Sequence, residues 1–288
     1  MSFVGKISGQ IRKMSTGGYP SLPKVLEVLR TFAPETLAEP WDNVGLLVEP
    51  ATPKPVSGVL LTNDLTEEVL QEAVKLRADL VISYHPPLFE PLKRITQASW
   101  KERIVATCLE RGIAVYSPHT AWDSVRGGVN DCLGKFLSEK YDKGEPIVPN
   151  KDRPDCGAGR IYQSLEDGGM SVSEIIAKLK LHISTPDQKI PVALVHPLTH
   201  KVKSVALCAG SGWSVLKGQK AELFITGEMS HHSILDANHS GSSVLLTNHS
   251  NSERMFLPTA KAYLESHLEG VSVNISSVDR DPLSLDTI

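Results

Sequence analysis

The sequence has little of what marks several large classes of protein. Only four of its 288 residues are cysteines, and none stands in a Cys-x-x-Cys spacing, so neither a zinc ribbon nor a dense disulfide framework is expected. The net charge of −3 gives no general attraction to nucleic acid or anionic membranes. No apolar run approaches the roughly 20 residues that span a bilayer. We therefore expect a globular protein of a reducing compartment, the cytoplasm or alternatively the nucleus or mitochondria, without a direct nucleic-acid partner or a membrane.

The amino terminus is poor in acids. Residues 1–20 contain three basic residues, and no acid precedes Glu27, which is typical of an organellar transit peptide. Three basic residues are few for such a signal, so a flexible tail over 1–20 is the favoured interpretation. From Leu22 to Phe32 the apolar residues follow helical spacing, and Pro34 ends that pattern.

Two stretches far apart in the chain share one form. Residues 115–123 and 244–253 each hold an apolar run of strand character, then a His, then a carboxylate four residues later. The segments before them also match, since strand, helix and strand over 59–85 recur over 205–228. The repeat predicts an α/β fold in which two similar βαβαβ-containing halves pack around a central crevice. In this alignment His85 corresponds to Glu228, His119 to His249, and Asp123 to Glu253.

The repeat also predicts how the chain is divided. After the tail, the first α/β half covers 21–140 and the second covers 158–288. Between them, residues 141–157 are rich in Lys, Asp and Pro and are predicted to be a linker. A strand at Gly159–Tyr162 and a helix over Ser171–Lys180, opened by a Ser-x-x-Glu capping box, begin the second half.

Polar residues that follow parallel strands gather at a crevice. Imidazole and carboxylate groups there suit zinc, iron or manganese. A single His after a strand is more often an ordinary loop or core residue, but the pattern occurs twice in the same position, which favours a divalent metal site between the halves. Asp64 has the spacing of a helix cap with Glu67 and is expected to be a cap rather than a ligand. The stretch Gly210–Gly212 fits either an anion-binding loop or a tight turn.

Five motifs in this order resemble a known family. They are the stretches Trp41–Leu46, Tyr84–Pro86, His119–Asp123, Thr226–His232 and His249–Glu253. Together they resemble the YbgI-type family, also called Ngg-one-interacting-factor-three-like, whose members are often labelled GTP cyclohydrolase I type 2 homologs. The resemblance covers about residues 22–285. It implies two α/β halves around a dinuclear metal site, assembled as a homo-oligomer, usually a hexameric ring; the inserted middle domain of longer relatives is absent here.

The resemblance also implies a ligand set. His85, Asp123, His249 and Glu253 match the family's metal ligands, with Glu253 similar to the acid that bridges two ions. The departure is Tyr84, which stands where the bacterial pattern has a His, and a phenol stays protonated at neutral pH unless a metal lowers its pKa. One ion or two per chain therefore remain open, and His119 is the nearest residue that could compensate.

Two classes of function follow from these expectations. The first is a metal-dependent hydrolase acting on a nucleotide or related small molecule, in which the ion lowers the pKa of water and presents hydroxide. In that case His119, His232 and Glu228 are the candidate catalytic residues, with one His of the pair His231 and His232 as general acid or base. The alternative is a metal-stabilised scaffold or transcription-related regulator that binds protein partners and catalyses nothing.

Overall fold

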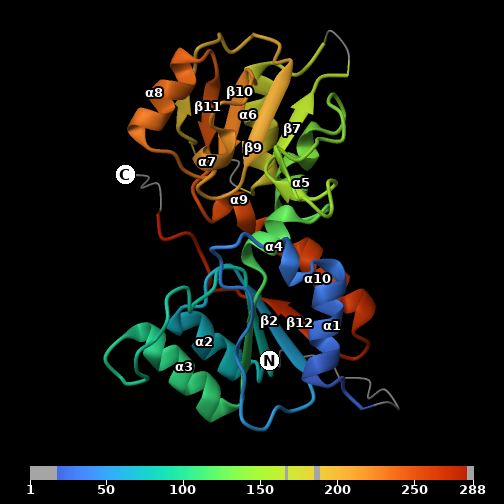
Figure 1. Ribbon diagram of the computed structural model, residues 1–288, viewed down its shortest axis with the longest axis vertical. Coiled ribbons are helices and arrows are strands. Elements are labelled where there is room, and N and C mark those ends of the chain that lie inside the picture. Colours follow the sequence, from blue (N-terminus) through green and yellow to red (C-terminus); the bar gives the residue numbers. More distant parts are fainter. Residues whose placement is uncertain (1–17, 166–167, 185–188, 284–288) are drawn as a thin grey trace, which may run out of the picture.

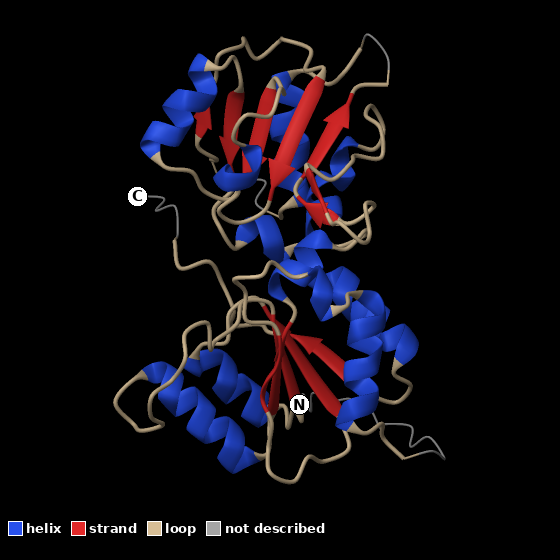
Figure 2. Ribbon diagram, viewed as in Figure 1, coloured by secondary structure: helices blue, strands red, loops and turns tan. Residues whose placement is uncertain are grey.

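The computed structural model describes residues 18–165, 168–184 and 189–283. Within them the chain forms two α/β units that lie one above the other along the long axis of the molecule (Figure 1). Each unit is built on a five-stranded sheet with helices packed against it (Figure 2). The expected α/β fold with two similar halves is confirmed, whereas the tail over 1–20 falls almost entirely outside the described residues.

The first sheet has the strand order β1-β4-β3-β2-β12. Strands β2, β3 and β4 are parallel and buried along their whole length, as expected for apolar strands covered on both faces. Strand β1 adds antiparallel to β4 at the edge. The first-unit elements up to this point are α1 (Leu22–Phe32), η1 (Glu35–Leu37), β1 (Gly45–Val48), β2 (Gly58–Thr62), α2 (Glu67–Lys75), β3 (Leu80–Ser83), α3 (Trp100–Arg111) and β4 (Ala114–Ser117).

Local signals explain where these helices begin and end. Helix α1 follows the expected range, has a proline in its first turn and turns its apolar side to the core. Helix α3 is capped at its start by Ser99, whose hydroxyl accepts from the Glu102 N–H, and at its end by Gly112 in the left-handed conformation. The cap of α2 is Thr66, whose side chain accepts from the Val69 N–H. The prediction that Asp64 caps this helix is therefore wrong, because Thr66 takes that position.

The second sheet has the order β7-β9-β10-β11-β8. Its three central strands are parallel, and β7 and β8 pair antiparallel at the two edges. The predicted capping box of α6 is confirmed, since Ser171 and Glu174 bond reciprocally. The elements are β7 (Arg160–Gln163), α6 (Val172–His182), β8 (Val192–Ala193), β9 (Ser204–Cys208), α7 (Trp213–Leu216), β10 (Leu223–Thr226), α8 (His231–His239), β11 (Ser243–Leu246) and α9 (Asn251–Arg254).

The repeat is visible in the order of elements. In the first unit β2, α2, β3, α3 and β4 lead to the short helix α4 (His119–Ser124), and in the second β9, α7, β10, α8 and β11 lead to α9. The strands pair alike, with Val59 opposite Leu80 in one sheet and Val205 opposite Leu223 in the other. Each unit therefore presents one short helix beyond the last strand of its repeat.

The end of the chain departs from the predicted division. Helix α10 (Leu257–His267) and strand β12 (Ser272–Ile275) were expected in the second half, but β12 pairs parallel with β2 in the first sheet. Helix α10 buries Leu257, Ala260 and Leu264 in the same core as α1. Beyond β12 the chain turns back toward the second unit (Figure 1). The carboxyl-terminal part therefore crosses between the units twice.

The region between the two units is structured. Helices α5 (Val129–Gly134) and η2 (Lys135–Leu137) precede a two-stranded sheet of β5 (Val148–Pro149) and β6 (Gly157–Ala158), which occupies part of the expected linker over 141–157. Arg160 is fully buried and donates to the carboxylate of Asp131 and to four backbone carbonyls. This guanidinium ties the first strand of the second unit to the end of the first.

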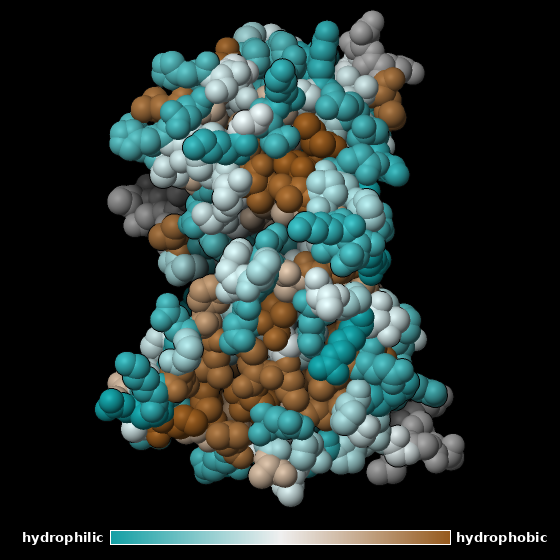
Figure 3. Space-filling model, viewed as in Figure 1, coloured by the Kyte–Doolittle hydropathy of each residue, from teal (hydrophilic) through white to brown (hydrophobic). Residues whose placement is uncertain are grey.

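Burial is continuous across the two units. The largest apolar cluster contains side chains of both sheets, among them Leu61 and Leu207, and two smaller clusters lie under α2 and α3 and under α7 and α8. Figure 3 shows apolar residues gathered on the visible face of the first unit, with a smaller group on the second unit, and hydrophilic residues around both. No helix of the described residues is long and apolar enough to cross a membrane.

Candidate metal centre

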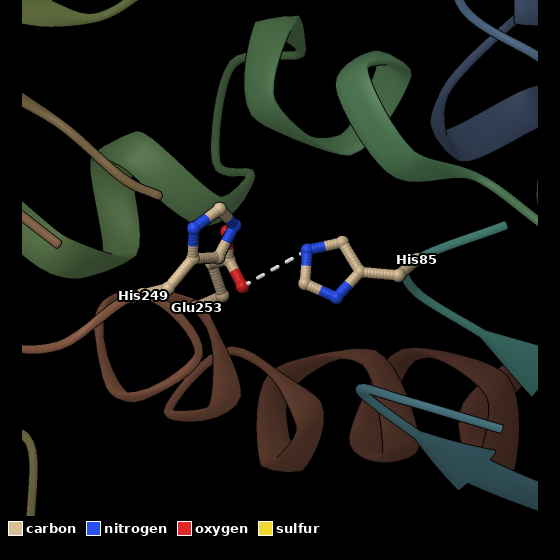
Figure 4. Close-up of side chains that lie close together, drawn as sticks. All are labelled: His85, His249 and Glu253. Atoms are coloured by element: carbon tan, nitrogen blue, oxygen red, sulfur yellow. Dashed lines mark ion pairs between the residues drawn. The ribbon is translucent and has the colours of Figure 1, made fainter. Parts of the chain in front are cut away.

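The carboxyl ends of the parallel strands in both sheets point to the boundary between the units. His85 follows β3, His249 follows β11, and Glu253 lies in α9. One ligand atom from each of the three lies within 4.8 Å of the others. In Figure 4 His85 approaches from one side and meets His249 and Glu253 on the other. The fold thus brings together three of the four predicted metal ligands, although His85 lies more than 160 residues before His249 and Glu253 in the sequence.

Glu253 is at the centre of this group. Only 3% of its side chain is exposed. Its Oε2 lies 3.3 Å from Nε2 of His85, and its Oε1 lies 3.3 Å from Nε2 of His249. Burial favours the neutral acid, but the two imidazoles outweigh this and lower the pKa of Glu253 to about 2. One buried carboxylate therefore presents a different oxygen to each imidazole.

Each of these imidazoles has a second carboxylate behind it. Nδ1 of His85 lies 2.9 Å from Oδ1 of Asp64, and Nδ1 of His249 lies 2.9 Å from Oε1 of Glu228. A carboxylate on Nδ1 fixes the ring and directs the lone pair of Nε2 forward, as in the outer shell of histidine metal sites. Asp64 and Glu228 are thus placed to orient the ligands.

The same pairing recurs at His119. Its Nδ1 lies 2.7 Å from Oδ1 of Asp42, a carboxylate with no exposed side-chain surface. Asp42 also accepts from the backbone N–H and the hydroxyl of Thr120. The ring centroid of His119 lies 5.4 Å from that of His85. His119 therefore stands beside the central group as a third oriented imidazole.

The raised pKa values of His85 and His249 show that the site is rich in negative charge. Burial lowers the pKa of His85, but Asp64 and Glu253 outweigh it and raise that pKa to about 10. Interaction with Glu253 raises the pKa of His249 to about 9, against the opposing effect of burial. Surroundings that stabilise two imidazolium ions are rich in negative charge, and the same field attracts a divalent cation, whose binding would release the protons.

The donor set fits a transition metal. Nε2 of His85 is buried, and apart from its 3.3 Å approach to Oε2 of Glu253 it has no partner with good hydrogen-bond geometry among the described residues, which leaves its lone pair available to an ion. Two imidazole nitrogens and one carboxylate are ligands that zinc, iron and manganese accept.

A Cβ added to Gly210 would lie 2.6 Å from Oε1 of Glu253 and 3.2 Å from Nε2 of His249, and the φ of Gly210 is +63°. Gly210 thus keeps the space beside these atoms open, which explains a glycine there.

Asp123 stands apart from the three-residue group. It is not among the residues whose ligand atoms converge, and its Oδ1 accepts a 2.6 Å hydrogen bond from the hydroxyl of Tyr84. Burial raises the pKa of Asp123 to about 6, although His119 and Tyr84 act in the opposite direction. Burial and the charge of Asp123 raise the pKa of Tyr84 well above its ordinary value. Tyr84 is therefore a neutral donor to a predicted ligand.

A cavity of about 420 Å³ opens beside the group. Both units contribute to its wall, which places the predicted crevice between the halves. His119, Asp123, His249 and Glu253 line it, as do Tyr84 and Gly210. His232, predicted as catalytic, does not line it: this residue and His231 are exposed at the start of α8. Glu228 reaches the site only through Nδ1 of His249.

A second layer of polar contacts holds Glu253. Nδ2 of Asn63 donates to its Oε2 at 3.0 Å. The backbone N–H of Asn63 donates to the carboxylate of Asp279 at 2.7 Å, and Arg254 pairs with the same carboxylate. Asp281 accepts from the hydroxyl of Ser250 at 2.8 Å. The segment after β12 therefore fastens the end of β2 to the helix that carries Glu253.

Sequence reasoning missed several of these residues. Asp64 was interpreted as a cap, Asn63 was given no role, and Asp279 was not singled out. The signal for Asp64 was its place directly after a strand, the same signal that identified His85. For Asp279 there was no local signal, since its partners are 25 and 216 residues away along the chain.

The fold and the site together define a class: an α/β protein of two repeated units with a His, His, Glu metal-type group between them. This chain belongs to the Duf34/NIF3 (NGG1p interacting factor 3) family, whose sequence pattern matches residues 20–282. The predicted resemblance is confirmed by that match.

Relatives and solved structures agree with this assignment. The chain is 47% identical to "NIF3-like protein 1" of Drosophila melanogaster, covering 95% of this chain and 92% of that protein. It is 36% identical to "NGG1-interacting factor 3" of Saccharomyces cerevisiae, covering 92% and 96%. A Bacillus cereus protein related to NIF3 superposes with a TM-score of 0.81 at 21% identity, over 94% of this chain and all of that one. Reduced HcgD from Methanocaldococcus jannaschii gives 0.76 at 24% identity, over 89% and 98%.

Proposed function

We propose that the protein is a metal-dependent, hydrolase-like protein. His85, His249 and Glu253 would hold a zinc, iron or manganese ion, and Asp123 would complete the first site or contribute to a second. One observation carries the proposal: two imidazoles, each backed by a carboxylate on Nδ1, direct Nε2 at the two oxygens of one buried glutamate. Carboxylates hydrogen-bonded to Nδ1 are a usual feature of histidines that ligate metals, and this supports the proposal.

The bound ion would supply Lewis acidity and lower the pKa of water. The residues around it would do the rest. His119 lines the cavity together with Asp123. With Asp123 assigned to the metal, the imidazole of His119 is the group that we propose as general acid or base. Asp42 fixes the ring of His119, so this imidazole keeps one orientation toward a substrate.

The substrate that we propose is a nucleotide or related small molecule of a size suited to the cavity of about 420 Å³. We also propose that the chain forms a homo-oligomer, a hexameric ring by the family resemblance, and holds one or two ions. The compartment we propose is the cytoplasm, with the nucleus or mitochondria as alternatives.

A second function has its own support. The Saccharomyces cerevisiae relative is named as a factor that interacts with NGG1, and Tyr84 occupies a position that a metal ligand holds in the bacterial pattern. These two observations favour a metal-stabilised scaffold that binds protein partners without turnover. The two functions differ in whether the metal-loaded protein turns over a substrate.

The experiment combines metal analysis with turnover. Protein purified without chelator and reconstituted with Zn²⁺, Fe²⁺ or Mn²⁺ is analysed for bound metal, together with His249→Ala and, as a matched control on the exposed helix α8, His232→Ala. We expect at least one ion per chain in the wild type and the control and far less in His249→Ala. The loaded protein is then tested against a nucleotide panel: hydrolysis supports the first function, and its absence with full metal content supports the scaffold.

A further inference from the structure

Two large aromatic side chains are exposed beside the metal centre. Trp41 is 61% exposed and Phe89 is 45% exposed. Their ring centroids lie 6.1 Å apart with the planes tilted by 56°. Rings of this size normally bury most of their surface in a core. Because the rings of Trp41 and Phe89 remain exposed, they are available to bind a ligand.

The pair stands between two cavities. Trp41 and Phe89 line the inner cavity, which contains His249 and Glu253, and they also line an outer cleft of about 840 Å³. They are the two residues that these two walls share. A ligand that reaches the metal centre from the outer cleft therefore passes the two rings.

The backbone that carries the rings is fixed. Asp42, next to Trp41, is buried against His119 and Thr120. The side-chain amide of Asn43 donates to the carbonyl of Leu88, the neighbour of Phe89. The two loops are thus joined to each other and to the imidazole at the site. Rings held in place before binding cost a ligand less ordering.

The charge of the outer cleft indicates what lies beyond the rings. Lys93 and Arg94 line it together with two acids, Glu90 and Asp42, of which Asp42 is paired with His119. Glu102, which interacts with Arg94, lies outside the lining. A cationic wall past an aromatic pair fits a ligand with a planar ring and an anionic group. In nucleotide-binding grooves, stacking on aromatic side chains and attraction to basic residues act together in this way.

We propose that Trp41 and Phe89 form a stacking site for a planar heteroaromatic ring whose anionic substituent, such as a phosphate, meets Lys93 and Arg94. The ring then lies between the outer cleft and the metal residues and determines which substrates reach them. This inference rests on the proposed function, because it names the residues that would recognise the ring and the anionic group of the substrate at the same site.

The test is calorimetric titration of the metal-loaded protein with the four nucleoside 5′-monophosphates, and then with the nucleoside and ribose 5-phosphate that correspond to the tightest binder. We expect that nucleotide to bind more tightly than either fragment. Trp41→Leu should weaken it about 10- to 100-fold, the loss expected for one stacked base, and Trp41→Phe should restore most of the affinity. Phe89→Leu should act in the same direction.

Tyr19→Leu is the matched control, because the Tyr19 ring is 40% exposed but lines neither of the two cavities. Ribose 5-phosphate binding as tightly as every nucleotide, or an affinity unchanged by Trp41→Leu, would overturn the stacking site. A lower mass of Trp41→Leu in light scattering with unchanged nucleotide affinity would also overturn it and assign the rings to self-association. Metal content is measured on the same samples. A wild type that binds no metal would contradict the proposed function, whereas the nucleotide affinities test the stacking site.

Discussion

The hydroxyl of Tyr84 donates a 2.6 Å hydrogen bond to Oδ1 of Asp123. The family resemblance implies Asp123 as a metal ligand, and it places Tyr84 where the bacterial His-His-Pro pattern has its first His. The phenol therefore does not replace the imidazole as a ligand but occupies one oxygen of the neighbouring carboxylate. The first prediction follows from this pair.

Replacing Tyr84 with His should strengthen a second metal site. The variant frees one oxygen of Asp123 and adds a ring nitrogen, while Pro86 keeps the turn rigid. We expect one tight ion per chain in the wild type and two in Tyr84→His, measured by metal titration at micromolar concentration. Tyr84→Phe, which removes only the hydroxyl, is the control and should not gain the second ion. Two equally tight ions in the wild type would contradict this account of Tyr84.

The carboxylates behind the imidazoles should govern metal affinity without touching the ion. Asp64→Asn and Glu228→Gln each keep the size of the side chain but remove the charge that orients His85 or His249. We expect each to weaken metal binding about 10- to 100-fold, measured by competition with a chromogenic chelator. Asp236→Asn, on the exposed face of α8, should leave the affinity unchanged. Equal affinity in all four proteins would show that these contacts are incidental.

The segment after β12 should support the metal centre from outside. Asp279→Asn weakens the contacts to the backbone of Asn63 and to Arg254, and Asn63 is the residue that donates to Glu253. We expect lower metal affinity together with a lower Tm. A Tm that falls while metal affinity stays constant would assign Asp279 to stability alone.

The buried pair of Arg160 and Asp131 should dominate stability between the units. Arg160 has no exposed surface, and Asp131 is its carboxylate partner at 2.8 Å. Removal of one partner leaves a buried charge unpaired, so Asp131→Asn should lower the free energy of unfolding by about 3–5 kcal/mol. Urea denaturation measures this. Glu139→Gln, in an exposed pair with Lys178, is the control and should leave the midpoint unchanged.

The same pair predicts a pH dependence. Burial raises the pKa of Asp131, but Arg160 and Arg126 outweigh it and hold that pKa below its ordinary value. A carboxylate with a lowered folded-state pKa stabilises the protein above its unfolded value, near 3.9, and this stabilisation is lost as the pH falls through the folded value. Stability of the wild type should therefore decline below about pH 4. Asp131→Asn should decline less steeply, and identical slopes would contradict the prediction.

Much of the fold and part of the site could be predicted because the chain repeats itself. The match between 115–123 and 244–253 placed each His at the end of a strand, and parallel strands carry such residues to one edge. The repeat pointed to six residues, and the family resemblance selected four of them as ligands: His85, Asp123, His249 and Glu253. The fold brings together the ligand atoms of three, His85, His249 and Glu253. Helical periodicity predicted α1, and the capping box of Ser171 and Glu174 predicted the start of α6.

What could not be predicted depends on contacts between distant segments. Strand β12 lies outside the repeat, and nothing local indicates that it pairs with β2 of the other unit. Asp64 had the spacing of a cap, but Thr66 two residues later competes for that position and leaves the carboxylate of Asp64 for His85. His232 had a favourable place in a motif, and only the path of α8 shows that it is exposed.

The central claim is that Glu253 joins His85 and His249 around one divalent ion. Isothermal titration with Zn²⁺, supported by elemental analysis, tests it most directly in the wild type, Glu253→Gln and His232→Ala. Glu253→Gln keeps the shape but removes the charge between the two imidazoles. The account predicts at least one ion per chain in the wild type and in His232→Ala, and loss of tight binding in Glu253→Gln. Less than about a tenth of an ion per chain in the reconstituted wild type, or tight binding unchanged in Glu253→Gln, would contradict it.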